Sequence, residues 1–81
     1  MRLSSIEVAD LIDRFLRGEV GPYEWDDFIS IRSRDPRIER VRRECLEIPD
    51  RYPTESGYCN DAGVARLREL ASSLRAQTRR S

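Results

Sequence analysis

The chain has 81 residues, of which 15 are basic, all of them arginine, and 15 are acidic, so its formal net charge is zero. A chain of this length forms a single domain over residues 1–81, and its 38% of hydrophobic residues favours a folded domain over a disordered one. Zero net charge excludes a global electrostatic attraction to nucleic acid or to an anionic membrane surface.

The first 18 residues, MRLSSIEVADLIDRFLRG, lack the continuous apolar core of a secretion signal, because Glu7, Asp10 and Asp13 interrupt it. No segment approaches the roughly 20 apolar residues that span a bilayer. We therefore expect a cytoplasmic protein, in which Cys45 and Cys59 are thiols. Two cysteines without any histidine do not suit a metal site, so we expect neither a metal nor another cofactor.

A first helix is predicted over residues 5–17. Ser4 and Glu7 have the spacing of a capping box, and Gly18 is suited to the turn that ends a helix. Two ion pairs, each between an acid at i and a base at i+4, are expected on its solvent-exposed face: Asp10 with Arg14, and Asp13 with Arg17. Apolar residues recur at helical intervals on the other face: Val8, Leu11, Ile12, Phe15 and Leu16.

A shorter second helix is predicted over residues 22–31. Pro22 suits its first position, because the N–H that proline lacks would have no partner there. Trp25, Phe28 and Ile29 stand at i, i+3 and i+4 and form one apolar stripe. This stripe is predicted to lie in the core, whereas the acids of the same stretch face the positive end of the helix dipole.

A third helix is predicted over residues 36–47, with Asp35 as its N-cap. It is predicted to end before Pro49, because a proline inside a helix lacks the N–H that the helix needs. The segment 48–63 holds two prolines, two glycines and no helical period, which predicts one long ordered loop pinned by Tyr52, Tyr58 and Cys59.

A fourth helix is predicted over residues 61–76, capped by Asn60 or Asp61, and it carries the most regular apolar stripe of the chain. Residues 77–81 are predicted to be a frayed tail. Four stripes without any alternating, strand-like segment predict an all-α fold, a compact bundle of about four helices.

Catalysis is not expected. The chain has no histidine and no serine or cysteine in a recognisable nucleophile setting, and the adjacent Asp26 and Asp27 point about 100 degrees apart on a helix. A protein-binding function is favoured over catalysis, because the chain has an acidic edge beside tyrosines. Tyrosine recurs in interface hot spots. The candidate residues are Glu19, Tyr23, Glu24, Asp26, Asp27, Tyr52 and Tyr58.

Nucleic-acid binding is the alternative, because arginines gather between residues 32 and 43. Glutamates in the same helix favour a neutralised, solvated face instead. The candidate residues for this alternative are Arg34, Arg37, Arg40 and Arg43.

Five segments between Phe15 and Gly63 form an ordered pattern: FLRGEV, YEWDDFIS, RDPRIERVR, CLEIPDRYP and GYCNDAG. With this pattern the chain resembles a group of small uncharacterised bacterial helical proteins, which implies a bacterial helical domain and no catalytic residues. In length and helix count it is also similar to the four-helix immunity proteins that neutralise nuclease toxins. That second similarity, which is one of architecture, implies an immunity-type or regulatory partner.

Overall fold

Four helices make up the computed structural model of the protein, which describes residues 4–79. They are α1 (Ser5–Leu16), α2 (Pro22–Ser30), α3 (Pro36–Arg51) and α4 (Asp61–Arg79). No strand occurs within the described residues. The radius of gyration of 12.1 Å is close to the value of about 12 Å expected for a compact domain of this length. The predicted all-α bundle is therefore confirmed.

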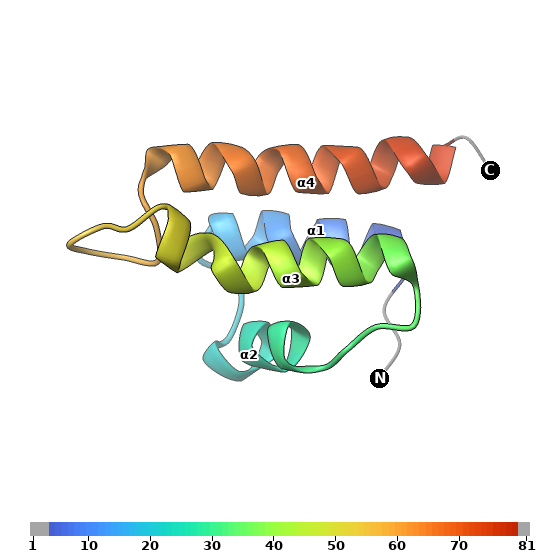
Figure 1. The fold of residues 1–81 in the computed structure, drawn as a ribbon, viewed down its shortest axis with the longest axis horizontal. Coiled ribbons are helices and arrows are strands. Elements are labelled where there is room, and N and C mark those ends of the chain that lie inside the picture. The colour runs from blue at the N-terminus through green and yellow to red at the C-terminus, as the bar shows by residue number, and fades with distance from the viewer. Residues whose placement is uncertain (1–3, 80–81) are drawn as a thin grey trace.

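Helices α1, α3 and α4 form the body of the bundle, and the short α2 lies against α3 (Figure 1). Helix α4 packs along both α1 and α3. Each helix contributes apolar side chains to one core, as the four stripes predicted. The buried apolar residues are Val8, Ala9, Leu11, Ile12, Trp25, Phe28, Ile38, Val41, Cys45, Ile48, Leu67, Leu70, Ala71 and Leu74.

The predicted capping residues end the helices as expected. The hydroxyl of Ser4 accepts a hydrogen bond from the N–H of Glu7, whose carboxylate accepts one from the N–H of Ser4. Gly18 has a φ of +73°, in the left-handed region that glycine enters without steric strain. At the start of α4, the side chain of Asn60 accepts a hydrogen bond from the N–H of Gly63 at 3.0 Å. Local sequence signals therefore place these three helix ends correctly.

An aromatic cluster joins α2 to α1 and to the loop after α3. The ring of Trp25 stacks on that of Phe15 with centroids 3.9 Å apart, and the ring of Tyr58 meets Phe15 edge-on at 4.9 Å. Phe28 lies against Trp25 at 5.5 Å. Trp25 and Phe28 are buried and Ile29 is partly buried, so the core role predicted for this stripe is confirmed.

The predicted end of the third helix is wrong, because α3 continues through Pro49 to Arg51. Pro49 has no N–H to donate to the carbonyl of Cys45, four residues earlier. The hydroxyl of Tyr58 donates to that carbonyl instead, at an O···O distance of 3.0 Å. A side chain from the following loop thus replaces the missing backbone donor, and the loop itself shortens to residues 52–60.

The phenol of Tyr58 is expected to matter because of Pro49. Replacing Tyr58 with phenylalanine leaves the Cys45 carbonyl without its donor and should lower the free energy of unfolding by about 1 to 2 kcal/mol. In a Pro49→Ala background the new backbone N–H can bond to that carbonyl. Tyr58→Phe should therefore lower the free energy of unfolding by less in this background. Urea denaturation of the wild type, the two single variants and the double variant measures this difference. An equal loss of stability from Tyr58→Phe with and without Pro49 would contradict the idea that the Tyr58 hydroxyl replaces the N–H that proline lacks.

The fourth helix is longer than predicted, since it reaches Arg79. The predicted helix end at residue 76 is therefore wrong, whereas the frayed tail over residues 77–81 stays a prediction, and residues 80–81 lie outside the described part of the chain. The first turn of α4 packs closely against the preceding loop at Gly63. A Cβ added to Gly63 would lie 2.8 Å from the Cβ of Cys59 and 2.9 Å from that of Tyr52. Glycine at this position permits that close approach.

The charged face of α1 makes contacts between helices rather than the predicted pairs within α1. The guanidinium of Arg75 on α4 lies 2.8 Å from the carboxylate of Asp10 and 2.6 Å from that of Asp13. Arg14 reaches Glu24 on α2 at 2.8 Å. The ion pairs of Asp10, Asp13 and Arg14 thus tie α1 to two neighbouring helices, whereas Arg17 pairs locally with Glu19 just after α1.

Candidate protein-binding site

The seven residues predicted for protein binding do not form one surface. Glu24 and Asp27 line a common groove. Tyr23, with 82% of its surface exposed, lies outside the lining of that groove, as do Asp26 and Glu19. The four acids and Tyr23 are nevertheless exposed, as a binding role requires.

The two loop tyrosines serve the fold. The ring of Tyr58 lies in the aromatic cluster and its hydroxyl bonds to α3, while Tyr52 is partly buried against the core. Burial raises the pKa of the Tyr58 phenol. The expectation that these residues pin the loop is confirmed for Tyr58, and neither of them adjoins the groove.

The groove runs between α1, α2, the link 31–35 and the first turns of α3, and it encloses about 1400 Å³. Three of its apolar side chains stay open to solvent, since Ile6 is 41% and Ile31 is 53% exposed and Pro36 is also exposed. The other three are buried core residues. The apolar lining comprises Ile6, Leu11, Phe28, Ile31, Pro36 and Ile38.

Charges of opposite sign lie on different parts of the groove. Acidic side chains come mainly from α1 and α2, with Asp35 in the link as the exception, and basic ones come mainly from the link and the start of α3. The ion pair between Arg14 and Glu24 bridges α1 and α2 along the lining. The acids are Glu7, Asp10, Glu24, Asp27 and Asp35, and the bases are Arg14, Arg32, Arg34, Arg37 and Arg42.

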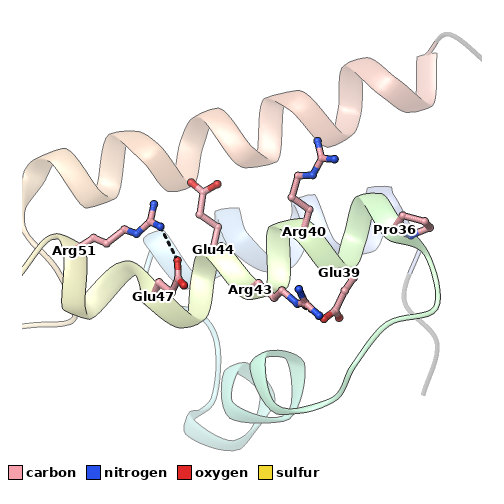
Figure 2. A pocket seen from close by; sticks show the side chains of 7 residues that line it. All are labelled: Pro36, Glu39, Arg40, Arg43, Glu44, Glu47 and Arg51. Atoms are coloured by element: carbon pink, nitrogen blue, oxygen red, sulfur yellow. Dashed lines mark hydrogen bonds and ion pairs between the residues drawn. The ribbon is translucent and has the colours of Figure 1, made fainter.

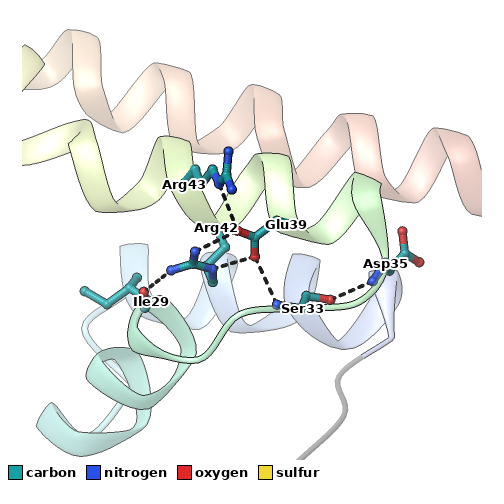
Figure 3. Close-up of polar contacts among 6 residues, drawn as sticks. All are labelled: Ile29, Ser33, Asp35, Glu39, Arg42 and Arg43. Carbon is teal, nitrogen blue, oxygen red and sulfur yellow. Dashed lines mark hydrogen bonds and ion pairs between the residues drawn. The ribbon is translucent and has the colours of Figure 1, made fainter.

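A buried ion pair fixes the wall of the groove formed by the link (Figure 3). Arg42 is only 6% exposed, and its guanidinium binds both carboxylate oxygens of Glu39, at 2.8 and 2.7 Å. It also donates to the backbone carbonyl of Ile29 at 2.6 Å, near the end of α2. The Glu39 carboxylate accepts further bonds from the N–H of Ser33 at 3.0 Å and from Arg43 at 2.9 Å.

This network connects α2, the link and α3 through one bidentate contact, the strongest common form of charged hydrogen bonding. The pairing of Arg42 is not among the predictions made from the sequence. One signal could have found it: Arg42 lies four residues after Ile38 and three before Cys45, on the apolar side of the helix. An arginine on such a stripe predicts a buried, paired guanidinium.

Acid should weaken this network. Hydrogen bonds from Arg42, and next from the N–H of Ser33, hold the pKa of Glu39 well below its usual range. A carboxylate with a lowered pKa stabilises the folded state at neutral pH. That contribution is lost as the pH falls from about 4.3, the usual glutamate value, towards the folded pKa.

We therefore expect the melting temperature to fall below about pH 5, and to fall less in a Glu39→Gln variant. The two proteins should converge in stability as the pH decreases. Melting followed by circular dichroism from neutral to acidic pH measures the difference. Parallel curves for the two proteins would contradict this role for Glu39.

The arginines of the nucleic-acid alternative are divided between two surfaces. Arg34 and Arg37 line the groove, whereas Arg40 and Arg43 line a separate, shallower cleft of about 390 Å³ on α3 (Figure 2). Within that cleft Arg51 pairs with Glu47 at 2.9 Å. The cleft carries equal numbers of acids and bases, because its charged residues are Glu39, Arg40, Arg43, Glu44, Glu47 and Arg51.

Neither cysteine has the character of a reactive thiol. Cys45 is buried, and burial raises its pKa to about 12. Burial also raises the pKa of Cys59. Both are free cysteines, and a thiol with a raised pKa is a poor nucleophile at neutral pH.

Comparison with known proteins gives no relative. The chain matches no protein-family model, no curated protein and no solved structure. None of the helices between residues 4 and 79 is both long and apolar enough to cross a bilayer. In the same part of the chain, no three His, Cys, Asp or Glu side chains come together in a way that would hold a metal ion. The groove is therefore interpreted from its own geometry.

Proposed function

We propose that this domain is a non-enzymatic, protein-binding module and that the groove between α1 and α2 is its binding surface. The observation that carries the proposal is the solvent-open apolar lining at Ile6 and Ile31, set between acidic and basic side chains. Apolar surface framed by polar residues is typical of protein-interaction sites. Charges of both signs around it select a partner with the complementary pattern.

An immunity-type or regulatory role is the form of protein binding that we favour. Such a role, in which a small domain covers or positions another protein, is what the similarity in length and helix count to nuclease-toxin immunity proteins implies. The same proposal places the protein in the cytoplasm, where the free Cys45 and Cys59 remain thiols.

The test compares two equally exposed apolar residues. Ile31 is 53% exposed in the groove, and Leu46 is 51% exposed outside it. Wild type, Ile31→Glu and Leu46→Glu proteins are used as baits in lysate of the producing cells, after circular dichroism shows equal folding. We expect bound proteins to be lost with Ile31→Glu and retained with Leu46→Glu. Equal capture by all three baits would refute binding at the groove.

Nucleic-acid binding stays the second candidate because Arg34 and Arg40 are exposed and form no ion pair within residues 4–79. It has less support, since Arg37 pairs with Asp35 and Arg43 pairs with Glu39. If it were the function, affinity for DNA or RNA would fall steeply with salt and would weaken in an Arg34→Ala/Arg40→Ala variant. No mobility shift with duplex or single strands at low salt would exclude it.

A further inference from the structure

We propose that the protein which occupies the groove is a second copy of this chain, docked about a two-fold axis that passes near Ile31. This dimer presupposes the proposed function, because it supplies the partner that the groove binds. Three residues of the groove carry the proposal: Asp27 is acidic, Ile31 is apolar and Arg34 is basic.

These three side chains are exposed and available. Asp27 lies on α2, and Arg34 lies in the link that follows. Neither forms an ion pair with any residue between 4 and 79. Ile31 stands between them in the sequence and leaves about half of its surface in solvent. Helix α2 and the link that follows it run in the same direction (Figure 1), so this edge of the groove presents acid, apolar and base in that order along the chain.

Such an order is complementary to itself. In a two-fold dimer, residue i of one copy meets residue j of its partner, and j meets i. An axis near Ile31 sets the two Ile31 side chains against each other. It brings Asp27 of each copy towards Arg34 of the other, which forms two equivalent ion pairs. A groove edge of one sign would instead repel its own copy.

The rest of the lining suits the same arrangement. Ile6 lies on α1 and is 41% exposed, so it extends the apolar centre away from Ile31. An apolar centre within a charged rim is the usual anatomy of a protein interface.

Sedimentation equilibrium from about 10 μM to about 1 mM protein tests the dimer. We expect a monomer–dimer equilibrium that weakens with added salt. Asp27→Arg alone and Arg34→Asp alone should each weaken dimerisation by about tenfold or more, because each sets like charges opposite one another. A mixture of these two variants should form a heterodimer, because both contacts then join opposite charges.

Asp26→Arg is the matched control, since Asp26 is the exposed neighbour of Asp27 outside the groove lining. It should leave the equilibrium unchanged. A monomer at every concentration in low salt, or a dimer that the two charge reversals do not weaken, would overturn the proposal. Capture of another protein that depends on Ile31 would then still support the proposed function, so the two failures are distinguishable.

Discussion

Replacing Trp25 with alanine is expected to lower the free energy of unfolding by about 3 to 5 kcal/mol. The ring is 4% exposed and contacts Phe15, Phe28 and Tyr58, so its removal opens a cavity where α1, α2 and the loop meet. Small domains have only about 5 to 15 kcal/mol of stability in total. The variant should therefore unfold at a much lower urea concentration than the wild type.

Tyr23→Ala provides the control for Trp25→Ala, because Tyr23 is an aromatic residue of the same helix with 82% of its surface exposed. It should change stability by less than about 0.5 kcal/mol. The indole N–H of Trp25 is buried and forms no hydrogen bond of ordinary geometry in the described structure. Trp25→Phe should therefore lower the stability less than Trp25→Ala does, since phenylalanine keeps an aromatic ring in the cluster. Equal effects of Trp25→Ala and Tyr23→Ala would contradict a core position for Trp25.

Replacing Arg42 with methionine is also expected to have a large effect: it should lower the free energy of unfolding by about 3 kcal/mol. The change leaves the Ile29 carbonyl without its donor and takes the bidentate partner away from Glu39. The loss lies at the lower end of the range for broken buried pairs, because Arg43 and the N–H of Ser33 still bond to the carboxylate. Urea denaturation measures it.

Arg43→Met is the matched control, because Arg43 binds the same carboxylate from an exposed position. This substitution should lower the free energy of unfolding by no more than about 1 kcal/mol. In an Arg42→Met/Glu39→Leu protein, part of the stability should return, since no unpaired carboxylate remains. If Arg42→Met and Arg43→Met have the same effect, the buried network does not fix the link between α2 and α3.

The fold could be predicted from the sequence because its determinants are local. The capping box at Ser4, the glycine at position 18 and the proline at position 22 each act within one helical turn. The apolar stripes select the faces that meet in the core, which is why Trp25 and Phe28 were assigned correctly.

Features that depend on distant residues could not be predicted. The sequence predicts that Pro49 ends a helix, and this is wrong because Tyr58 supplies the donor that replaces its N–H. The acids of α1 found partners on α2 and α4 rather than at i+4, because helix packing brings Arg75 close to Asp10 and Asp13. Each of these contacts forms only when the tertiary structure does.

The candidate site was predicted only in part for the same reason. Glu24 and Asp27 line the groove, but its other walls come from α1, the link and α3. No local pattern marks a surface assembled from four segments. Ile6 and Ile31 were missed because a single exposed apolar residue carries no signal until its neighbours are known.

The contact between α1 and α4 has a consequence for how the chain folds during synthesis. Asp10 and its partner Arg75 are 65 residues apart, and α4 covers both α1 and α3. A nascent chain that has not yet released α4 from the ribosome therefore leaves the apolar stripes of α1 and α3 uncovered. Distant contacts of this kind delay folding, so the core of this domain closes only after α4 has left the ribosome.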